Sequence, residues 1–289
     1  MKKGLILEGG AMRGLFTAGI LDVFLENGIK FDGLVGVSAG AVFGCSFKSE
    51  QFGRTLRYNL KYCRDKRYCS FRSLILTGDM YGKQFCYYDL PDKLDVFDKE
   101  KYNSNPMKFY VVATDIETGL PVYRSFDKSS GDFTEFMRAS ASMPFVSKPV
   151  EISGKKFLDG GISDSIPLEF FEKEGYDKNI VITTRELGYT KKKNPLTWYA
   201  KLTLRKYPHM IRAIAERHIM YNKQTEYIQE REKSGDIFVL RPEKPLKLKH
   251  AEHDPKKLRY AYDTGRELAL KKLPEIKKFL RLEDTTQNI

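Results

Sequence analysis

The chain has 289 residues, of which 41% are hydrophobic, so it can bury one large α/β core or a core with a smaller appendage. No run approaches the roughly 18 consecutive apolar residues that a membrane-spanning helix needs. Residues 1–3 lead into a strand and not into an apolar signal segment. These features predict a cytoplasmic protein.

Positive charge is concentrated in the last third of the chain. Residues 1–185 hold 26 Lys and Arg against 24 Asp and Glu, whereas 186–289 hold 24 against 14, which is +10 of the total +12. Such asymmetry indicates an acidic partner surface or a solvated surface that only maintains solubility. Because no zinc finger, helix-turn-helix or RNA-binding signature is present, peripheral contact with the anionic inner face of a membrane ranks above nucleic acid. The sequence does not indicate an oligomeric state.

The predicted elements up to residue 185 alternate between strands and helices. This alternation predicts an α/β fold with a mostly parallel central sheet and helices on both faces. Residues 51–66 are expected to be helical, and a loop-rich segment with aromatic residues follows to residue 98. For 70–90, ordinary packing around an irregular connection is favoured over a lid or a substrate wall. Strands are expected at 3–8, 34–37, 108–115, 122–126 and 179–184, the last of the core, and helices at 15–26, 39–47 and 133–141.

The amino-acid composition and the pattern of predicted elements change after residue 185. Residues 191–195 are typical of a linker, and a basic, mainly helical region is expected to pack on the first part of the chain. The interpretation is therefore an α/β domain at 1–185, which contains the motifs described below, and a C-terminal region at 186–289. Within that region we expect helices at 196–207, 210–233 and 255–282, the last kinked or restarted at Pro274, a short strand at 237–240, and a frayed end at 283–289.

One pentapeptide has the pattern of a serine nucleophile. Gly36-Val37-Ser38-Ala39-Gly40 follows an apolar strand segment and precedes an apolar helix, so Ser38 is expected on the turn between them. Glycines on both sides allow strand and helix to approach closely while the hydroxyl stays exposed. Ser38 is therefore the candidate nucleophile, with Gly36 and Gly40 as supporting residues.

A glycine-rich loop lies upstream, between the first strand and the first helix. Such a loop presents free amides and the positive end of a helix dipole, which suits a phosphate or a transient oxyanion. A dinucleotide site would need an acidic residue after the second strand, and a P-loop would need Gly-Lys-Ser/Thr; both are absent. The sequence therefore predicts an oxyanion hole made by Gly9, Gly10, Ala11, Met12, Arg13 and Gly14.

A third candidate lies far along the chain. Asp159 ends a short strand and is followed by Gly160 and Gly161. An isolated Asp-Gly is usually a turn residue bonded to its own backbone. The convergence of three loops on the carboxyl edge of one sheet instead indicates one site that contains Ser38 and Asp159.

With these three motifs in order, the chain resembles the patatin-like phospholipase family, bacterial branch, over residues 3–172. The similarity includes Arg-Ala-Ser-Ala-Ser-Met-Pro at 138–144 and Asp-Ser-Ile-Pro at 164–167. The resemblance implies a Ser38–Asp159 dyad that cleaves carboxylic esters of lipids, as a phospholipase A does. Ala11 departs from the family pattern, because many members have a third glycine there.

Two other functions remain open. A Ser-His-Asp esterase would take its histidine from His209, His218, His250 or His253. Alternatively, a non-catalytic protein would use the basic region on a membrane or a nucleic acid. Neither a metal nor another cofactor is expected, since Cys45, Cys63, Cys69 and Cys86 lack C-x-x-C spacing and no histidine precedes His209. Phe16, Phe43, Met143 and Phe145 are candidates for an acyl-chain groove, with core packing expected for at least half of them.

Overall fold

The computed structural model describes residues 1–282, so the expectation for 283–289 lies outside the described residues. Within them the strands form one eight-stranded sheet in the order β5-β6-β3-β2-β1-β7-β8, with β4 paired to β3. β1, β2, β3, β7 and β8 are parallel, which confirms the predicted fold class. The strands are β1 (Lys3–Leu7), β2 (Gly33–Val37), β3 (Lys108–Asp115), β4 (Pro121–Ser125), β5 (Val150–Ile152), β6 (Lys155–Asp159), β7 (Lys178–Ile182) and β8 (Ile237–Leu240).

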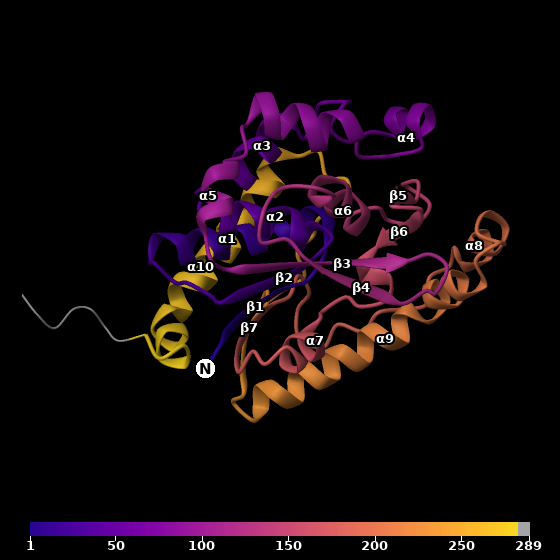
Figure 1. Ribbon diagram of the computed structural model, residues 1–289. Coiled ribbons are helices and arrows are strands. Elements are labelled where there is room, and N and C mark those ends of the chain that lie inside the picture. The colour runs from indigo at the N-terminus through magenta and orange to yellow at the C-terminus, as the bar shows by residue number, and fades with distance from the viewer. Residues whose placement is uncertain (283–289) are drawn as a thin grey trace, which may run out of the picture.

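Helices cover both faces of the sheet (Figure 1). Alternate residues of β1 explain why both faces are apolar. Leu5 and Leu7 belong to a core with α1 (Gly14–Glu26), α2 (Ala39–Lys48) and α10 (Pro255–Phe279). Ile6 joins a second core, on the side of α7 (Leu168–Lys173) and α9 (Pro208–Lys233). The central strands are therefore buried on both sides, as parallel strands generally are.

The segment expected to be rich in loops contains further helices. The helix expected at 51–66 is shorter, and it is α3 (Arg54–Tyr62). After it come α4 (Phe71–Thr77), a π-helix at Phe85–Leu94 and α5 (Lys99–Ser104). The remaining helices are α6 (Phe133–Ser140) and α8 (Thr197–Thr203).

The C-terminal region contributes to the sheet. The expectation that 179–184 is the last strand of the core is wrong, because β8 pairs in parallel with β7 from Asn179–Ile237 to Ile182–Leu240. Of the kink or restart expected at Pro274, the restart does not occur, since α10 continues through Pro274 to Phe279.

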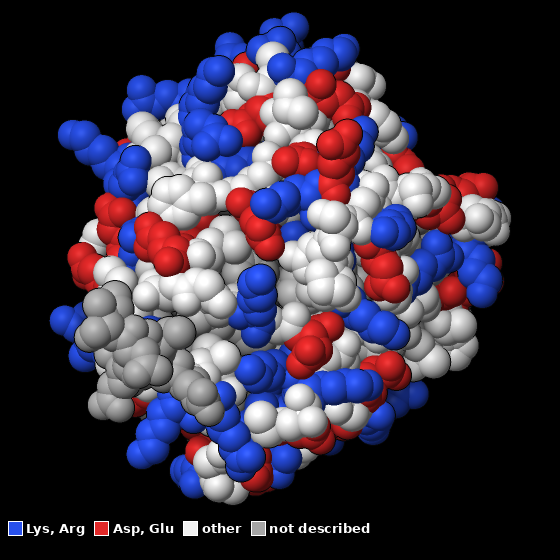
Figure 2. Space-filling view, turned by 60° about the vertical axis from the view of Figure 1, so that its left-hand side comes forward, with Lys and Arg blue, Asp and Glu red and all other residues white. Residues whose placement is uncertain are grey.

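Charge on the face of α10 is mixed. In Figure 2, Lys and Arg are interspersed with Asp and Glu on this side of the molecule. Ion pairs such as Lys271–Glu243 and Arg266–Glu26 account for part of this mixing. None of the helices described here is both long and apolar enough to cross a bilayer.

Candidate active site

Ser38 occupies a strained turn between β2 and α2. Its backbone has φ 54° and ψ −124°, a conformation that costs a non-glycine residue about 1–3 kcal/mol. A Cβ at position 36 would lie 2.5 Å from the Cα of Ala41, and one at position 40 would lie 2.5 Å from the carbonyl oxygen of Leu7. The two motif glycines are therefore required for the close approach of strand and helix. The Ser38 amide donates to Oγ of Ser140 at 2.9 Å, which fixes the turn from α6.

The glycine-rich loop lies against this serine. A Cβ at Gly9 would be 2.9 Å from the Cβ of Ser38. Among the described residues, none accepts a hydrogen bond from the amides of Gly9 to Met12, whereas the Arg13 amide donates to the carbonyl of Gly10 at 3.1 Å. Four free amides beside a serine hydroxyl suit the binding of an oxyanion. Ala11 adopts a left-handed φ of 48°, which explains why glycine would fit this position more easily.

Asp159 reaches Ser38 through the register of the sheet. Val37, the last residue of β2, pairs with Val112, and Asp159 pairs with the next residue of β3, Ala113. β4 pairs with residues 110–114 of β3 along one edge of that strand. β6 must therefore pair along the opposite edge of β3, directly beyond the point where β2 ends. The end of β6 therefore meets the end of β2. The three motifs converge as expected, but Asp159 arrives on an antiparallel strand and not at the carboxyl end of a parallel one.

The Asp159 carboxylate is buried and held by its own loop. Its Oδ1 accepts a hydrogen bond from the Gly161 amide at 2.8 Å. Burial raises the pKa of Asp159, while the positive charge of Arg217 and hydrogen bonds from the Ser38 side chain and the Gly161 amide lower it. A buried carboxyl with a raised pKa and a serine partner is the environment expected of a general base.

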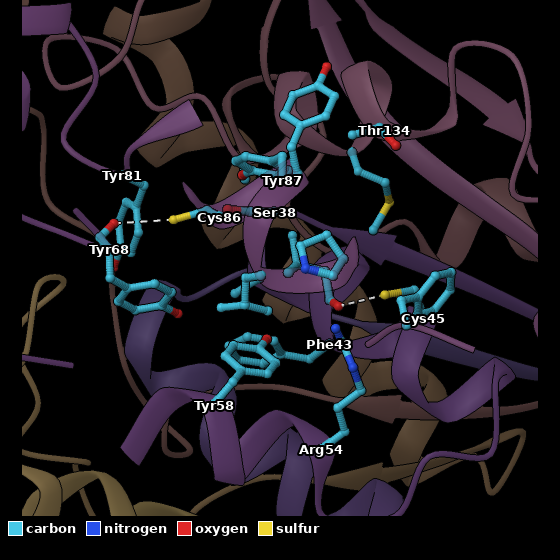
Figure 3. Close-up of a pocket in the computed structure, with 18 of the residues that line it drawn as sticks. Ser38, Phe43, Cys45, Arg54, Tyr58, Tyr68, Tyr81, Cys86, Tyr87 and Thr134 are labelled. Atoms are coloured by element: carbon cyan, nitrogen blue, oxygen red, sulfur yellow. Dashed lines mark hydrogen bonds between the residues drawn. The ribbon is translucent and has the colours of Figure 1, made fainter. Parts of the chain in front are cut away.

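An apolar cavity of about 320 Å³ opens on one side of Ser38 (Figure 3). Tyr58, Tyr68, Tyr81 and Tyr87 surround it, together with Phe43. The π-helix forms part of the wall of this cavity. Residues 85–94 therefore line a cavity in addition to packing on the core, whereas the sequence favours packing alone. Of the four residues suggested for an acyl groove, Phe43 and Met143 line this cavity, Phe16 lies in the core, and Phe145 packs on Tyr199 with ring centroids 5.6 Å apart.

A second cavity, of about 430 Å³, is also lined by Ser38, and its lining includes Asp159. Its lining is basic and includes Arg13, Arg185, Lys191, Lys192, Lys193 and Arg217. Most of these residues follow β7 or belong to α9, whereas the sequence predicts only a linker at 191–195. The three consecutive lysines at 191–193 indicate positive charge but not where that charge lies in the fold. A long loop has no periodic pattern from which the position of its side chains could be predicted.

The four histidines are distributed unequally around the site. His218 and His250 line the basic cavity, whereas Nδ1 of His253 lies 2.5 Å from the carbonyl oxygen of Cys63. The His209 carbonyl lies beside Gly119, on the β3–β4 connection. In the described part of the chain, no histidine ring is hydrogen bonded to Ser38 or to Asp159.

The fold and the site together define a protein with a mostly parallel α/β sheet and a buried serine on a strand-to-helix turn. Comparison with known families agrees: a model described as patatin-like phospholipase matches residues 5–171, and another, described as a domain of unknown function, matches 207–281. The chain belongs to the patatin-like phospholipase family. Membership places it among the hydrolases that act on lipid ester bonds.

Individual relatives vary in how much of their length is shared. "Uncharacterized protein YjjU" of Escherichia coli K12 is 27% identical over 256 residues, which are 84% of this chain and 69% of that protein. "Lysophospholipase nte1" of Aspergillus fumigatus is 24% identical over 185 residues, and "Lysophospholipase NTE1" of Saccharomyces cerevisiae is 24% identical over 177 residues. These stretches are 60% of this chain but only 11% and 10% of the two lysophospholipases. The crystal structure of VipD from Legionella pneumophila has a TM-score of 0.46 and 11% identity, and the match covers 95% of this chain and 67% of that one.

Proposed function

We propose that the protein is a serine acyl hydrolase that cleaves a carboxylic ester of a lipid through a Ser38–Asp159 dyad. The observation that carries the proposal is the placement of Ser38, Asp159 and the free amides of 9–12 around the mouths of two cavities. The strained turn carries the hydroxyl, and the buried carboxylate of Asp159 has the Ser38 side chain as a hydrogen-bond partner. No cofactor enters this chemistry.

The proposed reaction has two half-reactions. Asp159 takes the proton of the Ser38 hydroxyl while Oγ attacks the ester carbonyl carbon, and the loop amides stabilise the resulting oxyanion. Collapse breaks the bond to the leaving alcohol, which takes the proton from Asp159, and leaves an acyl-serine. Water then gives a proton to Asp159, attacks the acyl carbon and releases the fatty acid, and the proton returns to Ser38.

The cavity on the apolar side supports an acyl chain as the group that is transferred. Tyrosine rings and Phe43 line it, and it begins at Ser38. The apolar side chains replace water around the methylene groups, each of which contributes about 0.8 kcal/mol when buried. The acyl carbonyl would then lie between Ser38 and the loop amides.

Two short helices with exposed apolar residues support contact with an anionic bilayer. Phe71 and Ile75 of α4 are 74% and 83% exposed, and Trp198 and Leu202 of α8 are 62% and 64% exposed. Both helices project on the right-hand side of Figure 1. Lys201 also lies on α8. Exposed aromatic and aliphatic side chains with neighbouring lysines fit peripheral binding at the inner membrane face of a cytoplasmic enzyme.

The test uses a fluorophosphonate probe that labels activated serines. We expect the wild type to be labelled and to hydrolyse a long-chain ester, and Ser38→Ala to do neither while it keeps the wild-type circular dichroism spectrum. Ser163→Ala is the matched control. Ser163 lies at the end of the short helical turn that follows Asp159, and its hydroxyl is hydrogen bonded to that of Thr114 and not to Ser38 or Asp159. Undiminished turnover by the purified Ser38→Ala variant would contradict the serine mechanism.

A further inference from the structure

The basic cavity contains more cationic groups than its own carboxylates can neutralise. Arg13, Arg185, Lys191 and Arg217 converge on it, against Glu8 and Asp159. None of the four cations forms an ion pair with a carboxylate within the described residues 1–282. Since like charges in a partly buried space repel each other, an arrangement of this kind is favourable when an anion is bound.

The carboxylate of Glu8 is already committed to other donors. It accepts hydrogen bonds from the Thr184 amide at 2.5 Å and from the Tyr221 hydroxyl at 2.8 Å. Asp159 is held by the Gly161 amide. The guanidinium groups, by contrast, have free donors: Arg13 is 7% exposed, and Nε of both Arg13 and Arg185 is buried without a partner. An unpaired donor on a buried arginine is costly, and the negative charge of an anion bound beside these two guanidinium groups would offset that cost.

The cations are held in place by the C-terminal region. The Lys191 amide donates to Oδ1 of Asn222 on α9 at 2.8 Å, and its ammonium lies 4.2 Å from the centre of the Tyr221 ring. The guanidinium of Arg185 lies 4.2 Å from the centre of the Tyr189 ring. Cations stacked on aromatic rings keep their outer donors available. The cluster is therefore a built site and not a set of solvated surface lysines.

The environment of Lys191 supports the same conclusion. Burial lowers the pKa of its ammonium to about 7, and Arg217, Arg13 and Arg185 act in the same direction while Glu8 opposes them. The clustering thus makes the protonated form unfavourable in the free protein. A bound anion would remove that penalty.

We propose that this cavity binds a phosphate group, and that the phosphate belongs to the headgroup of the lipid whose acyl chain enters the apolar cavity. The headgroup assignment rests on the proposed function, because the two cavities share Ser38, Ala11 and Met143. Arg185, Lys191 and Arg217 lie outside residues 5–171, which the patatin-like model matches. The region after residue 171, beyond the part that the family model matches, therefore determines the specificity for an anionic headgroup.

The first measurement does not depend on catalysis. Binding of octyl phosphate and of inorganic phosphate to the full chain is measured by calorimetry for the wild type, Lys191→Gln, Arg185→Gln and Lys233→Gln. Lys233 is an exposed lysine of α9 outside the cavity, so its variant is a charge-matched control. We expect octyl phosphate to bind the wild type and Lys233→Gln equally and each cavity variant about tenfold more weakly, as for the loss of one charged hydrogen bond. No binding of either phosphate would overturn the proposal.

The second measurement compares kcat/KM for 1-lauroylglycerol 3-phosphate and 1-lauroylglycerol. We expect the wild type to prefer the phosphorylated ester by at least about tenfold, and Lys191→Gln to lose about tenfold more on that ester than on the neutral one, mainly in KM. Equal kcat/KM values, with inorganic phosphate bound as tightly as octyl phosphate, would overturn the headgroup assignment in favour of free phosphate. Binding of octyl phosphate without hydrolysis of either ester would contradict the proposed function while it supports the anion site.

Discussion

Nε of Arg217 donates a hydrogen bond of 2.6 Å to the carbonyl oxygen of Gly161, so α9 holds the loop whose amide binds Asp159. The same guanidinium is the strongest opposing influence on the pKa of Asp159, which burial raises. A positioning residue from the C-terminal region therefore adjusts the proposed catalytic base.

Replacing Arg217 is expected to change the pH profile. Asp159 must be ionised to accept a proton, so kcat/KM decreases as the pH falls through its pKa. Arg217→Met removes the opposing charge and raises that pKa further, so the acid limb should move to higher pH. The check is the pH dependence of kcat/KM for a neutral ester, with Arg212→Met, a 75% exposed residue of the same helix, as the control. An unchanged acid limb, in a variant that is still active at alkaline pH, would contradict this coupling.

The choice between a dyad and a triad is tested at Asp159 and at the histidines. We expect Asp159→Asn to lower hydrolysis by about a hundredfold or more, because the amide keeps the size of the side chain but cannot accept the proton. His218→Gln and His250→Gln are the informative comparisons, since both rings line the cavity that contains Asp159. Each should keep most of the activity in a steady-state assay with a neutral ester.

His209→Gln and His253→Gln serve as controls outside this cavity. A folded histidine variant that loses as much activity as Asp159→Asn would favour the Ser-His-Asp esterase. A nearly normal Asp159→Asn would instead return this aspartate to the role of a turn residue.

The sequence predicted the parts of the fold that depend on local pattern. The apolar segment before Ser38 and the glycines around it specify a tight strand-to-helix turn, and the structure has that turn. The strand at 237–240 was also expected, but its place beside β7 was not, because pairing between distant strands leaves no local signal.

The candidate site could be predicted only in its motif residues. Ser38, Asp159 and the glycine-rich loop follow strands, so their order along the chain indicated a common location. Lys191 and Arg217 reach the site because α9 crosses the second face of the sheet, and an exposed basic helix has the same composition as one that lines a cavity. Tertiary packing, and not charge pattern, separates the two.

Ala11 offers a test of backbone strain beside the proposed oxyanion hole. Its left-handed φ of 48° is unfavourable for alanine and ordinary for glycine. We expect Ala11→Gly to raise the free energy of unfolding by up to about 1 kcal/mol, measured by urea denaturation. Ala18→Gly, inside α1, should lower it by about 1 kcal/mol. Equal destabilisation by both changes would show that the φ of Ala11 is not a source of strain.

The exposed apolar residues of α8 should determine binding to membranes. The double variant Trp198→Ser, Leu202→Ser removes two side chains that would be buried in the interface, so binding to vesicles of anionic lipid should weaken tenfold or more, at about 1.5–3 kcal/mol for each buried side chain. Vesicle sedimentation at two salt concentrations measures this effect. Tyr260→Ser, which changes a 67% exposed residue of α10, is the control. Equal losses in both proteins would contradict a specific role for α8.

The last prediction concerns the contact of α10 with the catalytic part of the chain. A Cβ at Gly265 would lie 2.0 Å from the carbonyl oxygen of Phe16, and one at Gly19 would lie 2.1 Å from that of Tyr262. The helices α1 and α10 thus cross through two glycines, backbone against backbone. Gly265→Ala should lower the free energy of unfolding by about 3 kcal/mol, because neither backbone can move aside without displacing its helix.

Gly44→Ala in α2 is the matched control for this change. A Cβ there would lie 3.0 Å from the Leu7 side chain, which can rotate, and alanine is the better helix former. Urea denaturation, monitored by both ester hydrolysis and circular dichroism, should therefore show a single transition for each variant. The free energy of unfolding should change little for Gly44→Ala and decrease strongly for Gly265→Ala. If Gly265→Ala unfolds α10 in a separate step while hydrolysis persists, the C-terminal helix is not required to hold the catalytic part together.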